Sequence, residues 1–588
     1  MWVASLLLCV VSSLVSTAWA QVTPDEPNDA PVIMDADGVE IRAGDMSERF
    51  GDEDAGTNGA YDASFIERLQ KQLPDPEDAL AKARVDLDKS GSKSEREVLE
   101  RMIERISQVQ EGRQVRLTLE DVLRRALAHS LAVRVSSYDP AIETTRVVEA
   151  EAAFDAAFFT NITNNKQNRP ATNALSGTNV QAFNASSGLR KLLPSGMQVE
   201  TSYVTSRTSN DFAFQTINPV WFSQFVTQFR QPLLRGFGLD FNRSQIHINK
   251  LSRRRAMQQF RRQVQDTLRQ TEEAYWQLVQ ARRNVVISAR VLASFEQIFS
   301  YLDARKEFDV YRIQLADTRA RLERTRAQFI ELVALVRDAE DRLIALMNDP
   351  EINLTDDIEV VPVIAPHFAR IQVDRVAEVQ AALDNRPEIV EARLNIDAAR
   401  IQVGVAKNQA LPQLDLVFRY SVDGLGRSHD RAFSEVTKND YNEYYIGIDF
   451  ELPVGNRARR AALRRAKLQY AQSIASLKQV FEQVILDVNQ AVRRLETRYD
   501  QIDPALQSVE ATEDQVASIK ARAEKKDFLT LNTELNTEQS LAQSRRDLLT
   551  ALVDYGVAII DLERAKGTLL QYNRVELMVD DGAEDPVN

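Results

Sequence analysis

Residues that cross-link a chain or coordinate metals are nearly missing from this sequence. Cysteine occurs once in 588 residues, as Cys9, so an internal disulfide and a cysteine-ligated metal are excluded. The four histidines are scattered, without partners at metal-ligand spacing; they are His129, His247, His367 and His429. We therefore expect no metal, no cofactor and no enzymatic chemistry.

Glycine and proline are absent from residues 239–349, and residues 456–555 hold only Pro504. The whole chain has 20 Gly and 18 Pro, so stretches of this length should hold several of each. Both residue types destabilise helix interiors, so their absence predicts very long helices. A helix rises about 1.5 Å per residue, which makes these helices longer than a globular domain is wide. Aromatic residues are only 7% of the chain, which suits helices packed along narrow seams.

Long hydrophobic runs are also scarce. After the N-terminus no stretch approaches about 18 consecutive apolar residues, so we expect no further transmembrane helix. The N-terminal run ends in Ala18-Trp19-Ala20, a cleavage signature that predicts a signal peptide over residues 1–20. No Lys or Arg precedes the run, and a retained membrane anchor is the alternative.

An acidic extension follows the N-terminal run. Residues 21–60 contain eleven acidic residues against two basic ones, Arg42 and Arg49, with scattered Pro and Gly. Such a composition cannot bury enough apolar surface to order a chain. We expect residues 21–111 to be a largely disordered extension, with exposed helix in its Glu-, Lys- and Arg-rich later part.

The rest of the chain contains an internal duplication. A helical pattern at residues 119–151 recurs at 375–407, an offset of 256, and Thr118 and Asp374 are suited to cap the two copies. The sequence around Pro232 recurs around Pro453, an offset of 221. The first copy therefore holds 256 − 221 = 35 additional residues, which we place in a polar surface loop over residues 161–187. The expected organisation is a first repeat over residues 112–350, a linker over 351–369, a second repeat over 370–573 and an acidic tail over 574–588.

Each copy ends in a helix with a heptad pattern. Apolar residues recur every seven positions, and small residues accompany them three positions further on, which lets helices approach closely. One such pattern alone would indicate an ordinary coiled coil, but two copies in register, each tied to strands, predict helical hairpins. The repeating positions are Leu315, Leu322, Phe329, Val336 and Leu343, and then Leu541, Leu548, Tyr555, Leu562 and Leu569.

Short segments of alternating polarity lie between the helices. Four are expected as strands, near residues 158–162, 197–203, 414–420 and 444–452; a fifth candidate, 221–229, should pair with the second. An apolar face with aromatics and a polar opposite face is typical of a transmembrane barrel with a wet lumen. The alternative is a small periplasmic sheet covered by helices. The candidate lipid-facing residues are Trp221, Phe225, Phe229, Phe418, Tyr444, Ile446, Ile448 and Phe450.

About four strands cannot close a barrel, because the smallest barrels need about eight. Insertion into a membrane therefore requires several copies of the chain to share one barrel. The sequence by itself does not fix whether two or three copies are needed.

Taken together, these features resemble the TolC-like outer-membrane efflux proteins over about residues 116–573. The strongest pieces are residues 117–158, the strand exit at 231–238, the segment 410–414 and the tail at 561–570. The resemblance implies a mainly α protein with a β-barrel part: duplicated strand and long helical hairpin repeats. It implies a homotrimer whose twelve-stranded outer-membrane barrel, four strands per chain, continues into a periplasmic α-helical coiled-coil tunnel.

The resemblance also implies a function and partners. The chain would be the outer-membrane channel component of a tripartite efflux or type I secretion system. It would passively conduct substrates from an inner-membrane pump, of RND or ABC type, that is joined to it by a periplasmic adaptor protein. The alternative is a structural coiled-coil protein of the cell envelope without transport activity.

The two hairpin turns would form the periplasmic tip and gate. The family places acidic residues just beyond these turns, where this chain has Gln314, Thr533 and Asn536. Nearby acidic residues could form the gate instead, and a solvated charged tip is the alternative. The candidate tip and gate residues are Lys306, Phe308, Asp309, Gln314, Asp317, Lys526, Asp527, Thr533, Glu534 and Asn536.

Two further motifs do not change this interpretation. Gly236-x-Gly238 lacks the third glycine of a dinucleotide fingerprint, so we expect a turn. Arginine clusters at 253–255 and 459–465 follow the strands at the same place in both copies. A secreted chain of net charge −13 predicts no nucleic-acid partner, and contact with outer-membrane lipid or a solvated helix face are the two alternatives.

Overall fold

The computed structural model of the chain follows the duplicated order of elements expected from the sequence. The described residues are 39–43, 72–73, 76–89, 93–107, 113–168, 170, 178–212, 215–307, 312–355, 358–363, 370–522 and 528–579. Residues 41–577 form one unit, and residues 1–40 with 578–588 form another. Strands β1 (Val39–Ala43) and β10 (Val575–Val579) lie where the units meet along the chain. The expected signal peptide and most of the acidic segment lie outside the described residues.

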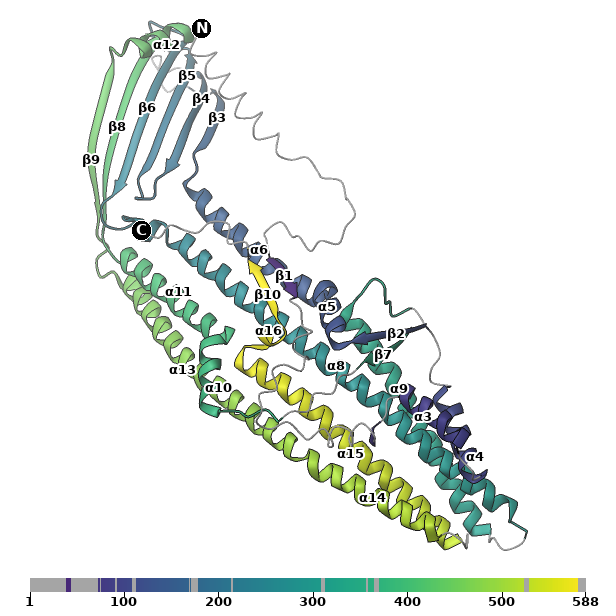
Figure 1. Cartoon of the computed structure of the whole chain (residues 1–588). Helices are drawn as coiled ribbons and strands as arrows, with labels where there is room; N and C mark the ends of the chain where they lie inside the picture. The colour runs from purple at the N-terminus through teal and green to yellow at the C-terminus, as the bar shows by residue number, and fades with distance from the viewer. Residues whose placement is uncertain are drawn as a thin grey trace. The chain divides into compact units, whose positions relative to one another are not determined.

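The first repeat runs from two helices into strands and then into a long helical hairpin (Figure 1). Helix α8 alone has 61 residues, which confirms the reading of the glycine- and proline-free stretch. The elements are α5 (Leu119–His129), α6 (Leu131–Glu151), the 3₁₀ turn η3 (Ala152–Phe154), β3 (Ala157–Asn168), β4 (Asn179–Leu192), β5 (Gln198–Asn210), β6 (Val220–Pro232), α7 (Leu239–Asn242), α8 (Ser244–Ala304) and α9 (Arg312–Met347).

The second repeat has the same order with fewer strands. Its outgoing helix breaks in two just before Pro504, which sits in the first turn of the second piece, where a missing N–H is tolerated. The elements are α10 (Arg375–Asn385), α11 (Pro387–Gln409), β8 (Gln413–Gly426), α12 (His429–Lys438), β9 (Asn442–Glu451), α13 (Arg457–Asp500), α14 (Ile502–Arg522), α15 (Phe528–Lys566) and α16 (Leu569–Tyr572).

Both repeats begin at the predicted helix caps. The Thr118 side chain accepts a hydrogen bond from the Asp121 backbone N–H, and the Asp121 carboxylate accepts one from the Thr118 backbone N–H. The Asp374 carboxylate accepts a hydrogen bond from the Val376 backbone N–H. Each cap satisfies backbone donors that the first turn of a helix cannot use internally.

The predicted heptad positions form the core between the helices. Leu343, Leu548 and Leu569 are fully buried, and Leu322, Val336, Leu541 and Leu562 are nearly so. Leu315, at the start of the series, is only half-buried. Helix α8 is the one described helix that is long and apolar enough to cross a membrane, but 67% of its most apolar window is buried inside the protein. Burial among neighbouring helices explains that apolar window.

The strands form a six-stranded antiparallel sheet in the order β3-β4-β5-β6-β8-β9. The expectation of four strands per chain is therefore wrong, because the described chain forms six. The expected polar surface loop over residues 161–187 is also wrong, because most of it belongs to β3 and β4, which pair from Ala157 to Asn168. The fifth candidate strand is β6, and it pairs with β5 as predicted.

The later part of the N-terminal extension is helical, as expected, but it is not simply exposed. It forms α3 (Pro76–Lys89) and α4 (Lys93–Ser107), and α4 packs against α8. One face of the pair is buried, including Leu80, Met102 and Ile106. The expectation of exposed helix is corrected because apolar residues at helical spacing give these helices a face to bury.

A second, small sheet ties the start of the first repeat to the expected linker. Strand β2 (Arg113–Thr118) pairs in parallel with β7 (Ile358–Val363). Strand β7 is buried along most of its length. The segment between the repeats is thus partly a structural strand.

Candidate functional site

The six-stranded sheet has two chemically different faces. Partners in an antiparallel ladder point to the same side, so the register assigns each residue to a face. Trp221, Phe225 and Phe229 pair with Gly426, Val422 and Phe418, and Phe418 pairs with Ile446. All the candidate lipid-facing residues of the sequence therefore share one face, which we call the apolar face. Ile446, Ile448 and Phe450 are each more than 60% exposed on it, at 65%, 67% and 62%.

The opposite face, which we call the polar face, carries charged and amide side chains. Arg230 on β6 contacts Asp415 on β8 at 3.1 Å and Asp449 on β9 at 3.2 Å. Gln224 donates a hydrogen bond to Asp423 at 2.8 Å. These partners lie on three adjacent strands, so the network crosses the sheet rather than following one strand.

Helix α12, which connects β8 to β9, covers one end of the apolar face. A side chain at Gly424 would meet the Ala432 carbonyl oxygen at 2.0 Å, so only glycine permits this close approach. His429 lies edge-on to Trp221 with ring centroids 5.6 Å apart and contacts the Tyr203 hydroxyl at 3.1 Å. Trp221 is therefore on the predicted face but packs against a helix. Among the described helices, α12 is the one that packs extensively on the sheet, and it covers one end of one face only.

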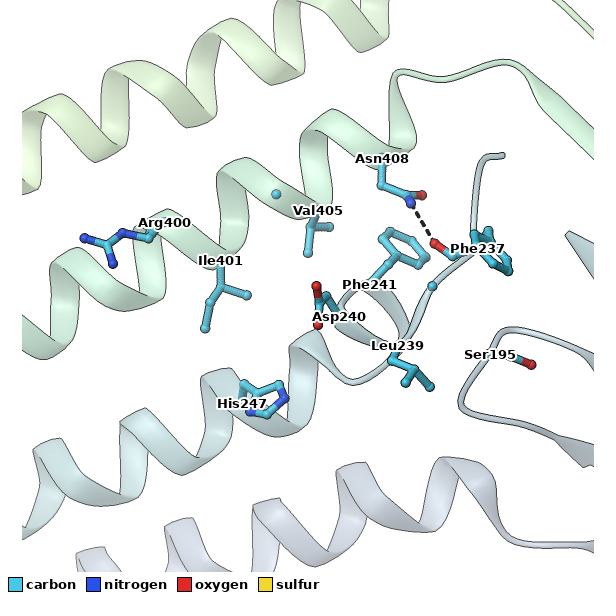
Figure 2. Close-up of a pocket in the computed structure, with 12 residues that line it drawn as sticks. Ser195, Phe237, Leu239, Asp240, Phe241, His247, Arg400, Ile401, Val405 and Asn408 are labelled. Carbon is cyan, nitrogen blue, oxygen red and sulfur yellow. Dashed lines mark hydrogen bonds between the residues drawn. The ribbon is translucent and has the colours of Figure 1, made fainter. Parts of the chain in front are cut away.

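The strands meet the helices around a cavity of about 880 Å³ (Figure 2). It lies between the α7–α8 segment and α11, and its lining includes Asp240, His247 and Arg400. Asn408 holds the wall together: its side chain accepts a hydrogen bond from the Gly236 N–H at 2.7 Å and donates one to the Phe237 carbonyl at 3.0 Å. Gly236 and Gly238 have positive φ angles, so this motif is the predicted turn.

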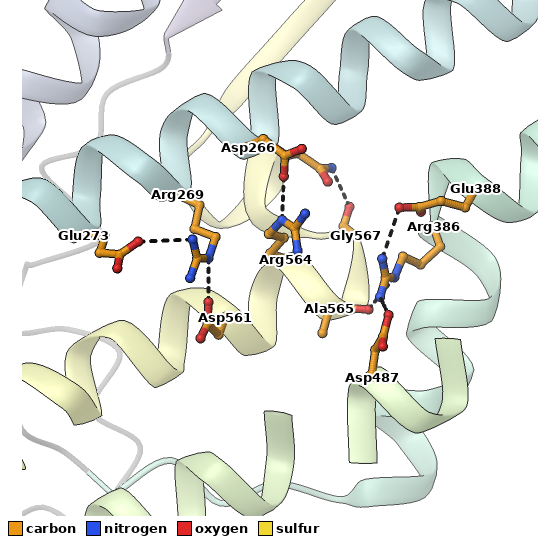
Figure 3. Close-up of polar contacts among 11 residues, drawn as sticks. Asp266, Arg269, Glu273, Arg386, Glu388, Asp487, Asp561, Arg564, Ala565 and Gly567 are labelled. Carbon is orange, nitrogen blue, oxygen red and sulfur yellow. Dashed lines mark hydrogen bonds and ion pairs between the residues drawn. The ribbon is translucent and has the colours of Figure 1, made fainter. Parts of the chain in front are cut away.

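Polar contacts join α8 of the first repeat to the last turns of α15 in the second repeat, and further contacts lie beside them within the second repeat (Figure 3). Arg564 on α15 contacts Asp266 on α8 at 2.6 Å, and Arg269 on α8 contacts Asp561 on α15 at 2.6 Å. Arg386, between α10 and α11, contacts Asp487 on α13 at 2.8 Å and donates to the Ala565 carbonyl at 2.8 Å. The charge pairs fix the register of helices whose apolar seams alone would allow sliding.

The candidate tip residues divide between described and undescribed positions. Phe308, Asp309, Lys526 and Asp527 lie outside the described residues. Lys306 lies in the turn that follows α8, and its side chain contacts the Asp303 carboxylate at 3.4 Å. Gln314, Thr533 and Glu534 lie on the first turns of α9 and α15, and the Thr533 hydroxyl donates to the Leu529 carbonyl at 2.8 Å.

The structure brings two of the candidates together from different repeats. Arg321 on α9 contacts Asp317 at 3.1 Å and donates a hydrogen bond to the Asn536 side chain on α15 at 2.8 Å. This Asp317–Arg321–Asn536 bridge joins the two hairpins near their turns. Sequence reasoning selected Asp317 and Asn536 but missed Arg321, which nothing in the sequence distinguishes from the other arginines of α9.

A buried ionic cluster was also missed. Arg282 on α8 contacts Glu359 on β7 at 2.8 Å and Glu340 on α9 at 3.5 Å, and all three side chains are at most 4% exposed. Burial raises the pKa of Glu340 to about 7, although Arg282 and Arg337 oppose the shift. No signal in the sequence marked this cluster, because Glu359 lies in the segment expected to be a linker.

Near the hairpin turns a second cluster links α14 and α15. Lys520 contacts Glu538 at 2.6 Å, and Glu538 is nearly fully buried. Burial alone would raise the pKa of Glu538, but Lys520, Arg290 and Arg545 together hold it below its ordinary value. The two helices of the second hairpin are thus joined by an ion pair close to its turn.

Residues 379–568, from α10 to the end of α15, match the outer membrane efflux protein family. This stretch is an outer membrane efflux protein domain. It spans most of the second repeat, and over these residues it confirms the resemblance to outer membrane efflux proteins expected from the sequence. The outer-membrane location expected from the sequence agrees with this match. A comparison with curated proteins gives no match.

Solved structures extend the likeness beyond the efflux protein domain. The CmeC outer membrane channel of Campylobacter jejuni superposes with a TM-score of 0.58 at 15% identity, covering 77% of this chain and 86% of CmeC. VceC, an outer membrane protein of Vibrio cholerae, gives 0.55 at 17% identity, covering 76% and 96%. The open state of the MtrE outer membrane channel of Neisseria gonorrhoeae gives 0.54 at 15% identity, covering 77% and 89%. At these identities the likeness shows the fold, and its extent shows that the first repeat shares it.

Proposed function

We propose that the protein is the outer-membrane channel component of a tripartite efflux or type I secretion system. The observation that carries the proposal is a two-faced antiparallel sheet joined at one end to two repeats of long helical hairpins. The efflux protein domain over residues 379–568 supports the same role. The channel conducts substrates passively from an inner-membrane pump, of RND or ABC type, that a periplasmic adaptor protein joins to it.

The sheet acts as part of a barrel wall. Its apolar face meets lipid, and its polar face, with Arg230, Asp415 and Asp449, lines a wet lumen. A single sheet of six strands is too small to close, because transmembrane barrels need at least about eight. Several copies of the chain must therefore share one barrel. The resemblance to trimeric channels makes this assembly a homotrimer, and the helical hairpins continue the barrel as a periplasmic tunnel.

The hairpin turns form the periplasmic gate. The candidate gate residues Asp317 and Asn536 are joined through Arg321, so the two hairpins are held together where they must separate to open. The acidic ring found in some relatives is replaced by this mixed bridge. The pump and adaptor supply the energy that breaks it.

Deleting the gene and testing a panel of dyes, detergents, antibiotics and metals examines this proposal. We expect several-fold greater sensitivity to part of the panel, restored by the wild-type gene on a plasmid. In membrane fractions the protein should be found in the outer membrane and should run as a heat-sensitive trimer on gels.

The control is a variant that is made in normal amounts and reaches the outer membrane but whose channel cannot open. A reducible cross-link between the hairpins, made by treating the Arg321→Cys and Asn536→Cys double variant with a bis-methanethiosulfonate reagent long enough to replace the arginine side chain, should reproduce the deletion phenotype, and a reductant should reverse it. Unchanged sensitivity after deletion would instead favour the structural envelope protein, and a soluble periplasmic monomer would contradict the channel.

A further inference from the structure

We propose that the outer-membrane barrel of this protein has 18 strands, closed where β9 of one copy pairs with β3 of the next. The inference rests on the proposed trimeric channel and adds its architecture: three copies of a six-stranded sheet give 3 × 6 = 18 strands. The twelve-stranded barrel implied by the resemblance does not fit this chain. The partner at each sheet edge is therefore a second copy of the same chain.

The two additional strands are β4 and β5. Strand β3 follows α6 as β8 follows α11, at the offset of 256, and β6 leads to α8 as β9 leads to α13, at the offset of 221. Between β3 and β6 the first repeat inserts a hairpin, from Asn179 to Asn210, that has no counterpart in the second. Its length accounts for nearly all of the 35-residue difference between the offsets.

The inserted hairpin is an integral part of the sheet. Strand β4 pairs with β3 from Asn168 to Ala157, and β5 pairs with β6 from Gln198 to Thr208, so it is bonded on both sides. Strands β4 and β5 have 14 and 13 residues, and about 9–11 tilted residues suffice to cross a bilayer. Their side chains alternate like the rest: Phe183 and Leu189 lie on the apolar face, and Asn184 and Ser202 on the polar face.

The turn between β4 and β5 is fixed to the segment that connects β6 to α8. Gly196 in the β4–β5 turn has a φ of +92°, and a side chain there would meet the Gly236 carbonyl oxygen at 2.4 Å and the Asn242 side chain at 2.9 Å. The Gly238 N–H donates to the Ser195 carbonyl at 3.4 Å. The turn is thus packed on the segment that leads from β6 into α8, and a hairpin that swung out of the wall would lose these contacts.

The sheet leaves two edges, β3 and β9, each paired on one side in the described chain. In lipid every backbone polar group must be bonded, so neither edge can stay open. Both edges also carry exposed apolar side chains: Phe158 and Ile162 are 56% and 63% exposed on β3, and Ile448 is 67% exposed on β9. Another copy of the chain offers the matching surface for each edge.

The strand directions suit this closure. Strand β3 runs away from the helices, because α6 leads into it, and β9 runs back toward them, because it leads into α13. Strand β9 of one copy and β3 of the next are therefore antiparallel, like every other pair in the sheet. An even number of strands per chain gives this result for any ring of copies, and the trimer sets the total at 18.

The strand count determines the width of the pore. Barrel diameter grows roughly in proportion to strand number, so 18 strands give about 1.5 times the diameter of twelve, and barrels of 16–18 strands leave an aqueous channel. The opening in the outer membrane is then of porin width. Selection of substrates falls to the helical end of the conduit.

Disulfide cross-linking of full-length protein in outer-membrane vesicles tests the closure, since the only native cysteine is Cys9. Thr160→Cys on β3 is combined in three separate proteins with Ile446→Cys, Ile448→Cys and Phe450→Cys on β9, all on the apolar face. At least one pair should give a covalent trimer on non-reducing gels. The control pair, Thr160→Cys with Asp449→Cys on the opposite face, should stay uncross-linked.

Electron microscopy of the purified protein in nanodiscs counts the strands directly, and 18 are expected. A variant in which residues 169–219 are replaced by a four-residue turn, so that β3 joins β6, should give twelve. If that variant does not fold, the count on the intact chain still decides. A twelve-stranded intact barrel, a covalent dimer that grows no further, or no cross-link in any of the three pairs would overturn the proposal.

These outcomes are separate from those of the proposed function. If the barrel has 18 strands but deleting the gene changes no sensitivity, the barrel architecture is supported and the efflux role is contradicted. A twelve-stranded barrel in a strain that loses efflux on deletion would keep the function and remove this architecture.

Discussion

At the scale of single residues, Glu340 is the carboxylate that burial disturbs most clearly. It lies against Arg282 between α8, α9 and β7, and its pKa is raised to about 7 from an ordinary 4.5 because burial disfavours the charged form. A carboxyl whose folded pKa exceeds its unfolded pKa holds its proton more tightly in the folded state. Its stabilising contribution is therefore complete below pH 4.5 and is lost as the pH rises through about 7.

We predict that Glu340→Gln flattens the pH dependence of stability over that window. At pH 8 the variant should be more stable than the wild type, by on the order of 1–3 kcal/mol, because it removes the cost of a buried charge. Thermal unfolding of the purified protein at several pH values measures this. Glu323→Gln, at an exposed site on the same helix, is the control and should behave like the wild type. If the stability of Glu340→Gln depended on pH as strongly as that of the wild type, Arg282 would fully compensate the charge of Glu340 in the wild type.

Residue-level signals in the sequence were reliable where the chemistry is local. Thr118 with Asp121, and Asp374, cap helices as predicted, because a cap needs only a side chain within three residues of the backbone it bonds. Arg321 could not be selected in the same way. Its importance comes from Asn536, which is 215 residues away in the chain.

At the scale of elements, the N-terminal extension connects both hairpins. Arg105 on α4 contacts Glu296 on α8 at 3.1 Å, and Gln72 donates a hydrogen bond to Glu513 on α14 at 2.7 Å. Gln72 also accepts one from Arg545 on α15 at 3.5 Å. The described part of the extension therefore holds together helices from both repeats.

We predict that Ile106→Asp releases α3 and α4 without unfolding the channel. Ile106 is 1% exposed, and a charge in its place would cost several kcal/mol if the helices stayed docked. Limited proteolysis should cut the extension in the variant much faster than in the wild type, while the rest of the trimer stays resistant. Glu104→Ala changes an exposed residue two positions before Ile106 and should leave the cleavage pattern unaltered. Equal cleavage of Ile106→Asp and wild type would show that the helices are held by other contacts.

At the scale of the whole molecule, the proposed gate depends on contacts between repeats. The Asp317–Arg321–Asn536 bridge is such a contact, whereas Arg326, on the same helix, pairs with Glu296 and Glu323 inside the first hairpin. The two arginines thus form a matched pair that separates gating from simple helix stability.

We predict that Arg321→Ala makes the closed channel leak. Losing a contact of about 1 kcal/mol in each of three copies should shift the closed–open equilibrium toward opening by tenfold or more. Greater sensitivity to large antibiotics that the outer membrane normally excludes, together with higher single-channel conductance, would measure it. Arg326→Ala should leave both unchanged, and equal leakage from the two variants would place the gate elsewhere.

The sequence by itself determined the helices, their seams and the duplication. Missing glycine and proline set the length of α8, and heptads from Leu322 to Leu343 and from Leu541 to Leu569 set which faces are buried. These properties depend on neighbours within one or two turns, so a local pattern is enough to specify them.

The tertiary structure alone decided the number of strands and the contacts between repeats. Strand β4 is rich in Asn, Ser, Ala and Gly, a composition that is typical of a loop. It becomes a strand because its backbone forms hydrogen bonds with β3 on one side and with β5 on the other. Backbone hydrogen bonds do not depend on the pattern of side chains. For the same reason the placement of Arg321, Glu340 and the extension helices could not be foreseen, since each depends on partners that only the folded chain brings close.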